Sequence, residues 1–408
     1  MYKCNLNRLD EKIKTFAKFG DTGHGGITRF SLSDEALAAR RELCKRCEAL
    51  GMNVATDDMA NIDATLPGSD SALPAIMSGS HLDSVRQGGN FDGVLGVLAA
   101  LEAFETIVTE NIPHRHPLTL VVWTNEEGAR FEPAMMSSGV ICGKFDKEKM
   151  LKSTDTEGIT FAEALEKSGF AGSIENRLTP QKYKALIEMH IEQGPVLEHE
   201  GIEIGIVFGV SGMINYEFTF CGQADHAGTT PMKFRKDALY AAAKTIQYLH
   251  DELDKLDPAL VYTTGKISCH PNIHTIIPDE VKFTLDARHY DPEVIKQVLE
   301  IIKRIPVEVE KCRTSYAEAW TRASVAFDPK LVDYVAASAA ELGYSADRIC
   351  SGPGHDAQFV AGLIPATMIF VPSQHGHSHC EKEFTATEAC LKGVNVLLAT
   401  ILKADAEG

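Results

Sequence analysis

The chain has 408 residues, of which 44% are apolar and 24% are charged, and its formal net charge is −17. Two domains are expected, because a single hydrophobic core stops growing at about 250–300 residues. The excess of acidic residues argues against a surface for nucleic acids or anionic membranes, since both carry negative charge themselves.

No apolar run reaches the roughly 18 residues that a membrane span requires. The first residues, MYKCNLNRLDEKIK, contain no apolar segment of signal-peptide length. The ten cysteines are scattered without paired spacing, as in proteins of a reducing compartment. These features predict a cytoplasmic protein with neither a membrane nor a nucleic acid as partner.

The first half of the chain alternates between predicted strands and helices. A helix is expected at 33–50, with Ser33 as its N-cap and Gly51 after its end. Further helices are expected at 94–109 and 161–168, and strands at 53–56, 62–66, 73–77, 118–123 and 183–189. The run LTLVVW at 118–123 is apolar throughout, which is typical of a central strand in a parallel sheet.

The pattern changes at about residue 210 and changes back after about residue 323. The inserted segment predicts strands at 214–220, 261–268, 281–288 and 307–311, with helices at 237–256 and 292–305. That order suits a small α+β sandwich with antiparallel pairing. Helices at 328–342 and 386–403 and a strand at 363–371 follow. The predicted fold is α/β: a mixed α/β/α domain with a mostly parallel sheet, residues 1–209 and 324–408, interrupted by a smaller α+β domain, residues 210–323.

Metal-ligating residue types follow four of the predicted strands. They are His81 with Asp92 in GSHLDSVRQGGNFDGVLG, Glu127 in TNEEG, His190 in HIEQGP and His379 in PSQHGHSH. One such histidine is more often a hydrogen-bonded residue than a ligand. Recurrence at four strand ends of one predicted sheet favours a metal site, because open α/β sheets bind ligands at that rim. Nitrogen and oxygen donors without thiolate suit Zn²⁺, Mn²⁺, Co²⁺ or Ni²⁺.

Five donors fit two ions if one carboxylate bridges them, and ions about 3.5–4 Å apart can together activate water. Glu126 precedes Glu127, and adjacent residues of an extended backbone point in opposite directions, so Glu126 can face the substrate as general base. The alternative is that both form a solvated acidic turn. Asp83 can accept a hydrogen bond from the ring of His81 and fix its tautomer, or it can cap the following turn.

Six motifs, in order along nearly the whole chain, resemble the hydantoinase/carbamoylase-type amidases of the dinuclear metallopeptidase superfamily. They are GSHLDS…GGNFDGVLG, TNEEGARF, HIEQGPVLE, GQADHAGTTPM, SGPGHDAQ and FVPSQHGHSH…EFT. This group contains N-carbamoyl-L-amino acid hydrolases, allantoate amidohydrolases, ureidoglycolate amidohydrolases and β-ureidopropionases. The resemblance implies a metal-dependent amidohydrolase that cleaves the carbamoyl or ureido C–N bond of a small carboxylate substrate and releases ammonia and carbon dioxide.

The resemblance also implies roles for the site residues. The implied ligands are, for one divalent ion, His81, Asp92 and His190, and, for the other, Asp92, Glu127 and His379. Zinc or manganese is favoured, and cobalt or nickel also suits these donors. Glu126 would act as base and then as acid. In a homodimer built through the inserted lid domain, His226 would donate to the oxyanion from the other subunit.

Four further residues are candidates for substrate contact. Arg288 would bind the substrate carboxylate, although an arginine on such a strand is otherwise expected to form a surface ion pair. Thr275 stands where the family often has asparagine, and Gln193 and His355 lie in two of the shared motifs. Asp225 also replaces a frequent asparagine, and its carboxylate beside His226 would favour a cationic ring.

Two alternatives to this function remain at the level of sequence. The nearer one is a dipeptidase or aminoacylase on the same scaffold, which would cleave a peptide-like amide. The more distant one is a non-catalytic binding protein, but an intact Glu126 and a complete ligand set argue against it. His375 and His377 precede His379 at two-residue steps, and an extended segment would point all three the same way. Of these three histidines only His379 is predicted to bind metal.

Overall fold

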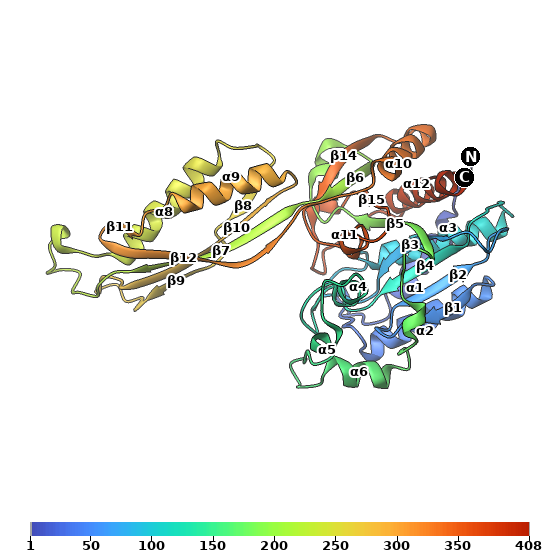
Figure 1. Ribbon diagram of the computed structural model, residues 1–408, viewed down its shortest axis with the longest axis horizontal. Coiled ribbons are helices and arrows are strands. Elements are labelled where there is room, and N and C mark those ends of the chain that lie inside the picture. The colour runs from blue at the N-terminus through green and yellow to red at the C-terminus, as the bar shows by residue number, and fades with distance from the viewer. Residues whose placement is uncertain (1, 408) are drawn as a thin grey trace. The chain divides into compact units, whose positions relative to one another are not determined.

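The computed structural model describes residues 2–407, which divide into two compact units. The first unit comprises the residues up to 209 and those from 326 onward, and the second comprises residues 210–325. The boundaries expected from the sequence, 210 and 323, lie close to these. Each unit has its own β-sheet (Figure 1).

The first unit combines ten α-helices with nine strands among the described residues. The helices are α1 (Leu6–Phe16), α2 (Asp34–Ala49), α3 (Val94–Thr109), α4 (Met136–Ile141), α5 (Lys147–Met150), α6 (Phe161–Ser168), α7 (Val196–Glu200), α10 (Pro329–Leu342), α11 (Asp356–Val360) and α12 (Thr387–Ala406). The strands are β1 (Asn53–Thr56), β2 (Ile62–Leu66), β3 (Ala75–His81), β4 (Leu118–Trp123), β5 (Tyr183–Ile191), β6 (Ile204–Val210), β13 (Val325–Ala326), β14 (Ala346–Ser351) and β15 (Ala366–Val371).

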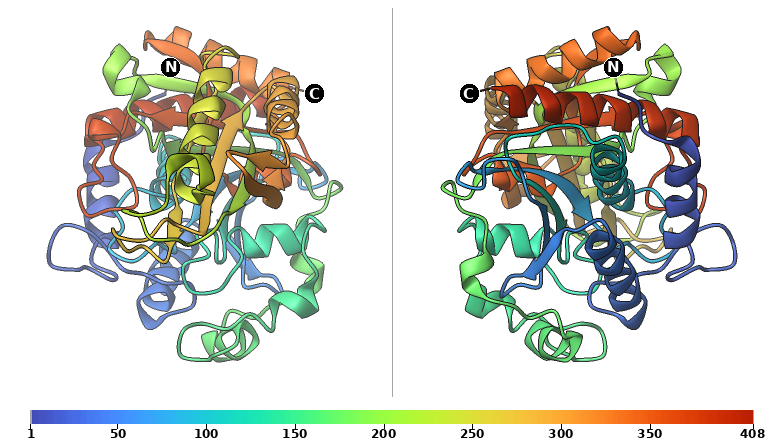
Figure 2. Two further views of the ribbon diagram at one scale, coloured as in Figure 1. Left: turned by 90° about the vertical axis from the view of Figure 1, so that its left-hand side faces the viewer. Right: turned by 90° about the vertical axis from the view of Figure 1, so that its right-hand side faces the viewer.

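The sheet of the first unit has the strand order β1-β2-β4-β3-β5-β15-β6-β13, and β14 pairs with β6. The central strands β4, β3, β5 and β15 are parallel, whereas β1, β2 and β6 pair antiparallel with their neighbours. Helices α3 and α12, the latter red in Figure 2, pack on the central strands, and α11, which contacts α4, packs on β5 and β15. Every residue of β3, β4 and β15 is buried, so the centre of the sheet is covered on both sides. The α/β class is therefore confirmed, with the parallel pairing confined to the centre.

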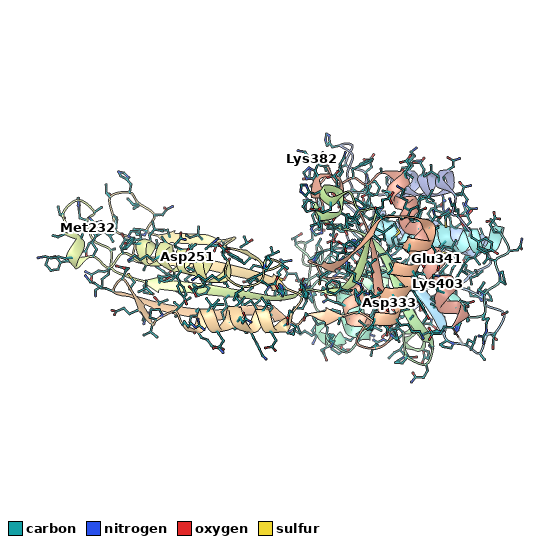
Figure 3. All side chains as sticks on the ribbon, turned by 90° about the horizontal axis from the view of Figure 1, so that it is seen from above. Met232, Asp251, Asp333, Glu341, Lys382 and Lys403 are labelled. Carbon is teal, nitrogen blue, oxygen red and sulfur yellow. The ribbon has the colours of Figure 1, made fainter. Side chains whose placement is uncertain are left out.

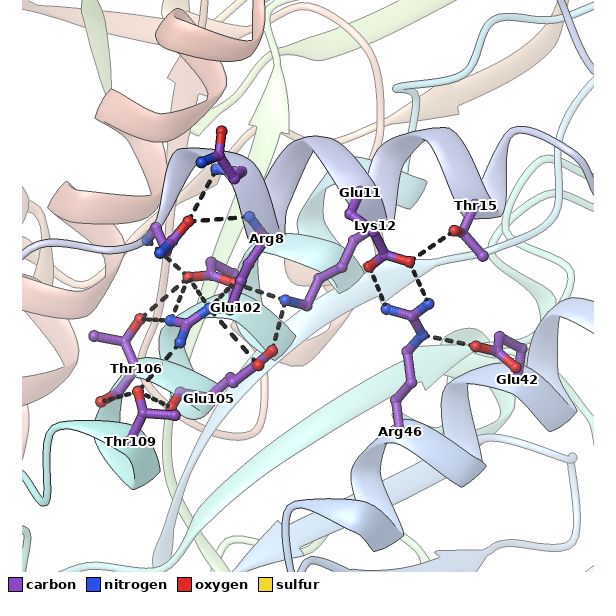
Figure 4. A network of polar contacts seen from close by, with 12 residues as sticks. Arg8, Glu11, Lys12, Thr15, Glu42, Arg46, Glu102, Glu105, Thr106 and Thr109 are labelled. Atoms are coloured by element: carbon purple, nitrogen blue, oxygen red, sulfur yellow. Dashed lines mark hydrogen bonds and ion pairs between the residues drawn. The ribbon is translucent and has the colours of Figure 1, made fainter.

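Burial on both faces explains the apolar sequences of the central elements. Every residue of β3, β4 and β15 is buried. Helix α3 is apolar on nearly all sides, because it lies between the sheet and helices α1 and α12. Its one buried carboxylate, Glu102, accepts from Arg8 and Lys12 of α1, each at 2.7 Å (Figure 4). Helices α10 and α12 also pack together, and Glu341 pairs with Lys403 at 2.6 Å (Figure 3).

The second unit is a two-layer α+β structure. Its elements are β7 (Gly212–Cys221), α8 (Ala238–Leu253), β8 (Val261–Thr263), β9 (Ile267–His270), β10 (Glu280–His289), α9 (Pro292–Lys303), β11 (Glu308–Val309) and β12 (Cys312–Arg322). The strands form an antiparallel sheet of order β11-β12-β7-β10-β8, with β9 also on β10. Helices α8 and α9 pack on this sheet over a core in which Phe218 and Phe283 stack at 4.8 Å.

Several elements differ from the sequence prediction. The strand expected at 261–268 is two strands, β8 and β9. The strand expected at 307–311 is the two-residue β11, and the long β12 that follows it was not predicted. Strand β12 escaped prediction because most of its side chains are exposed, which removes the alternation that reveals a half-buried strand. Helix α1 and strands β6 and β14 were also missed. Among the described residues, no helix is both long enough and apolar enough to cross a membrane.

Candidate metal centre

The predicted ligands of the first unit lie at the carboxyl ends of its parallel strands. His81 is the last residue of β3, and His190 is the penultimate residue of β5. Glu127 follows β4 after a short turn, and His379 follows β15. Asp92 precedes α3 by two residues. Because parallel strands end at the same edge of a sheet, segments far apart in the sequence meet there.

The five side chains form two groups that share Asp92. The ligand atoms of His81, Asp92 and His190 lie within 4.8 Å of one another, and so do those of Asp92, Glu127 and His379. Asp92 Oδ1 is 3.7 Å from His81 Nε2 and 3.2 Å from His190 Nε2. Asp92 Oδ2 is 3.2 Å from His379 Nε2, and Glu127 Oε2 is 3.4 Å from the same nitrogen. The two oxygens of one carboxylate thus face two different groups.

The donors in these groups fit a pair of divalent cations. Glu127 Oε1 is buried and has no hydrogen-bond partner among the described residues, which leaves a carboxylate oxygen to be satisfied by a ligand. His81 Nδ1 donates to the carbonyl of Asp83 and His190 Nδ1 to that of Ile191, both at 2.9 Å. Each Nδ1 therefore carries a proton, which leaves Nε2, on the side of the shared aspartate, as the nitrogen that can bind a metal. Imidazole and carboxylate donors without thiolate suit zinc or manganese.

The carboxylate of Asp83 has a different task from the one predicted. It was expected to accept from the ring of His81, but Asp83 Oδ1 lies 3.9 Å from His81 Nδ1, and the main-chain carbonyl is the acceptor. The carboxylate instead accepts from the backbone N–H groups of Glu126, at 3.3 Å, and Glu127, at 3.1 Å. Asp83 therefore holds the turn after β4 in place.

Glu126 is buried beside the first group of ligands, with Oε2 3.6 Å from His81 Nε2. It is therefore not part of a solvated turn. Burial raises the pKa of Glu126 well above its ordinary value, and the carboxylates of Asp356 and Glu127 add to the shift. A bound dication would oppose this shift by stabilising the ionised form. The raised pKa means that Glu126 takes up a proton more readily than an exposed glutamate does. This property suits a group that accepts a proton during the reaction and then returns it.

The pKa values of the two buried histidines, His81 and His190, are shifted in opposite directions. Burial lowers the pKa of His81, which favours the neutral ring that a metal requires. Burial also acts to lower the pKa of His190, but the hydrogen bond and charge of Asp92 outweigh it and raise that pKa to about 9. Burial alone would raise the pKa of Asp92, whereas hydrogen bonds from His190 and His379 hold it well below its ordinary value. A cation bound here would displace the shared protons.

Two predicted substrate-contact residues belong to the immediate surroundings of the ligands. Gln193 Nε2 donates to Asp92 Oδ2 at 2.7 Å, so its amide also orients the shared carboxylate. The ring of His355 lies edge-on to that of His190, with 4.6 Å between centroids, and its Nε2 contacts Ser351 Oγ at 2.9 Å. Glu188, which the sequence analysis missed, joins these two histidines in a third group of ligand atoms within 4.8 Å.

The segment before His379 is not extended. Residues Gln374–Gly376 form a short 3₁₀ turn in which His375 has a positive φ of 55°. His375 is largely exposed and lies 3.7 Å from Glu198. The three histidines are therefore not aligned, and only His379 belongs to the groups described above.

The other predicted residues, His226, Thr275 and Arg288, belong to the second unit. Ala227 N donates to Thr275 O at 2.9 Å, which ties the loop of His226 to that of Thr275. His226 Nδ1 accepts from Gly228 N at 3.0 Å. The Asp225 carboxylate accepts from Gln223 Nε2 at 3.2 Å, and the cationic ring of His226 stays a prediction.

Arg288 forms an ion pair within its own strand. Its Nε donates to Asp286 Oδ1 at 2.8 Å, and Nη2 lies 3.4 Å from Oδ2. The side chain is about one-third exposed. This is the surface ion pair that the sequence analysis kept as the alternative, and Nη1 takes no part in it.

Two buried arginines behind the rim also escaped the sequence analysis. Arg29 Nε donates to Leu82 O at 2.6 Å, directly after His81. Arg40 donates to Ala60 O and to Thr124 Oγ1, both at 2.6 Å. Thr124 lies shortly before Glu126 and Glu127 in the chain. They fix the ends of β3 and β4. Nothing local in the sequence distinguishes them from exposed arginines, because their burial depends on packing between distant segments.

Comparisons with known proteins place the chain among enzymes of one kind. The family model described as peptidase family M20/M25/M40 matches residues 77–403. An N-carbamoyl-L-amino-acid amidohydrolase of Rhizobium meliloti is 37% identical, over 98% of this chain and 97% of its own. An allantoate amidohydrolase of Bacillus subtilis is 33% identical, over 97% of both chains. A crystal structure of a hydantoinase/carbamoylase-family amidase from Burkholderia multivorans is 37% identical and superposes with a TM-score of 0.95, over 100% of this chain and 99% of that one.

Proposed function

The chain belongs to peptidase family M20/M25/M40, and from that premise we propose that it is a dinuclear metal-dependent amidohydrolase. The proposed reaction cleaves the carbamoyl or ureido C–N bond of a small carboxylate substrate, of the kind named for the relatives, with release of ammonia and carbon dioxide. The resemblance seen in the motifs is confirmed by these relatives. The observation that carries the proposal is the position of Asp92, whose two oxygens face two separate groups of ligand atoms.

His81, Asp92 and His190 would hold one ion, and Asp92, Glu127 and His379 the other. When bound, the two ions would lower the pKa of a water molecule and polarise the substrate carbonyl. Zinc or manganese is proposed, with cobalt or nickel as substitutes, because the donor set contains oxygen and imidazole only.

The acid–base step is proposed to belong to Glu126. Its Oε2 lies on the side of the first ligand group, 3.6 Å from His81 Nε2, so it can accept a proton from the attacking water. The same oxygen can then return the proton to the leaving nitrogen. Asp83 accepts a hydrogen bond from the backbone N–H of Glu126. This bond holds Glu126, and with it the Glu126 carboxylate, in a fixed position for the proton transfer.

Substrate binding is proposed to involve both units. In the second unit, His226 Nδ1 accepts from Gly228 N, so Nε2 is the ring nitrogen that can donate to a developing oxyanion. Asp286 holds Nε of Arg288, which leaves Nη1 for a substrate carboxylate. Thr275 is proposed to provide a hydroxyl to the substrate. Its backbone carbonyl accepts from Ala227 N, next to His226. In the first unit, Gln193 and His355, which contact Asp92 and His190, are proposed to contact the substrate as well.

We further propose that the second unit serves as lid and dimerisation domain of a cytoplasmic homodimer. Support comes from the resemblance and from the exposed position of His226, which leaves this ring available to another surface. The oligomeric state can be measured by light scattering, and a monomer at all protein concentrations would contradict the dimer.

The substrate class can be tested on chelated enzyme reloaded separately with Mn²⁺, Zn²⁺, Co²⁺ or Ni²⁺. Ammonia release is measured with N-carbamoyl-L-amino acids, allantoate and ureidoglycolate, and release of free amino acid is measured with dipeptides and N-acyl amino acids. We expect metal-dependent ammonia release from one of the ureido or carbamoyl acids. Cleavage of the dipeptides alone would instead establish the peptidase alternative.

A further inference from the structure

Glu383 is a buried carboxylate close to the metal ligands that none of the roles above uses. It lies four residues after His379, and its side chain is only 3% exposed. Its Oε1 accepts from the backbone N–H groups of Phe91 and Asp92, both at 3.0 Å. Its Oε2 accepts from Ser378 Oγ at 2.9 Å. One side chain therefore joins the segment that carries Asp92 to the segment that carries His379.

Ser378 strengthens this connection. Its hydroxyl also lies 3.2 Å from Asp92 Oδ2, the oxygen that faces His379 Nε2 at 3.2 Å. Asp92 is thus contacted twice from the same direction, at its backbone N–H by Glu383 and at its carboxylate by the Ser378 hydroxyl, whose single proton is shared between Asp92 Oδ2 and Glu383 Oε2. Ser378 precedes His379 directly and Glu383 follows it by four residues, so both contacts come from the segment that carries another ligand of the same proposed ion.

The glycine turn before Asp92 is shaped to admit the Glu383 side chain. A Cβ placed on Gly89 would lie 2.1 Å from Glu383 Oε1 and 2.3 Å from Glu383 Cβ. Any residue other than glycine would push the carboxylate away from the N–H groups that it binds. The sequence GGNFD therefore provides both a turn and the space for a side chain from the far end of the chain.

A similar contact exists on the other side of the centre, where Asp83 accepts from the N–H groups of Glu126 and Glu127. Glu383 differs in one respect. It joins the segments of two ligands, Asp92 and His379, that belong to the same group of donor atoms. A change in its position would alter the distance between these two ligands more than that between any others.

We propose that Glu383 is a positioning residue that sets the separation of Asp92 and His379, and through it the affinity for the ion that they share with Glu127. The inference rests on the proposed dinuclear centre. It assigns Glu383 a geometric role, which depends on its length and on the one oxygen that accepts from both backbone N–H groups, rather than on its charge.

The test is a Zn²⁺ titration of the metal-free full-length chain in competition with a chromophoric chelator. We expect Glu383→Ala to weaken one of two binding steps about 10- to 100-fold, the usual effect of removing a group that orients metal ligands. The affected step is identified as the one that His379→Ala abolishes. Glu383→Gln keeps the length of the side chain and an oxygen for the two N–H groups, so it should bind both ions with nearly wild-type affinity.

Glu381→Gln is the matched control. It removes the same charge from the same segment, but Glu381 accepts from Thr22 Oγ1 rather than from a ligand-bearing segment. Both binding steps should be unchanged in this variant. Melting of the metal-free proteins, followed by circular dichroism, separates loss of metal affinity from loss of folding.

Two results would overturn the inference. One is a folded Glu383→Ala variant that binds both ions as tightly as wild type. The other is a Glu383→Gln variant as weak as Glu383→Ala, since charge would then set the affinity. If Glu383→Ala does not fold, Ser378→Ala replaces it, and an unchanged affinity for the ion of His379 counts against the proposal. A wild-type chain that binds fewer than two ions would instead refute the dinuclear centre, whatever the variants do.

Discussion

Substitution of Gly93 by alanine should damage the metal centre directly. Gly93 precedes α3 with φ +65° and ψ −50°, next to Asp92. A Cβ built on it would lie 2.3 Å from both Nε2 and Cε1 of His81. Ordinary contacts of a Cβ begin at 3.4 Å, so the imidazole has to retreat by about 1 Å. Because the ring is buried at the end of β3, it can move only by turning Nε2 away from Asp92.

The expected magnitude has two parts. The φ and ψ of Gly93 lie in a region that residues with a side chain rarely adopt, which costs about 1–3 kcal/mol of unfolding free energy. Displacement of one ligand should weaken binding of the ion held by His81, Asp92 and His190 by about 10- to 100-fold, comparable with loss of an orienting group. Misplacement by about 1 Å should also lower kcat about 100-fold.

Gly143→Ala provides the control for backbone strain. Gly143 has a nearly identical φ of +68°, and a Cβ there meets no atom within 4 Å. Both variants should lose unfolding free energy in urea, Gly93→Ala the more because of its clash with His81, but only Gly93→Ala should lose metal affinity in the chelator titration. If Gly93→Ala binds two ions as tightly as Gly143→Ala, the contact expected between the new Cβ and His81 does not control metal affinity, and the prediction is wrong.

Three further predictions concern carboxylates. Glu126→Gln should lower kcat about 10²- to 10⁴-fold, the usual contribution of a general base, while two ions remain bound by metal analysis; turnover at the wild-type rate would remove the proposed mechanism. Glu102→Ala should cost about 3 kcal/mol in urea unfolding, because Lys12 is 2% exposed and keeps only Glu105 as a counterion; a loss below about 1 kcal/mol would contradict this. Burial raises the pKa of Asp63 to about 7 from its ordinary 3.8, so its proton stabilises the fold at low pH and this contribution fades as pH rises from about 4 to 7. Asp63→Asn should therefore gain urea midpoint relative to wild type between pH 5 and pH 8, and parallel curves would refute the assignment.

Much of the fold followed from periodicity. The helix 94–109 and the strand 118–123 were predicted with the bounds that the structure has, because burial on all sides leaves a continuous apolar sequence. Strand β12 was not predicted, since its exposed side chains carry no such pattern. It is a strand because its backbone pairs with β7, a contact that no local sequence encodes.

The same distinction applies to the site. The identities of the donors, the four strand ends and the resemblance were all present in the sequence. The acceptor used by His81 was predicted incorrectly, because Asp83 offers a carboxylate and a carbonyl and only the folded turn decides between them. The partners of His226 and Asp225 were not predicted either: the N–H of Gly228 donates to His226 Nδ1, and the Asp225 carboxylate accepts from Gln223 Nε2.

The sequence by itself determined which chemical groups this protein brings to its sheet edge, because residue types and strand periodicity are local properties. The tertiary structure alone decided which atom of each group meets which partner. Asp92 illustrates the difference. The sequence GGNFDG identifies it as a candidate ligand, but one of its oxygens faces His190 and the other His379, and only folding brings these segments together. Hydrogen bonds and ligand contacts vary over fractions of an ångström, and that precision is set by packing around the side chain rather than by its neighbours in the chain.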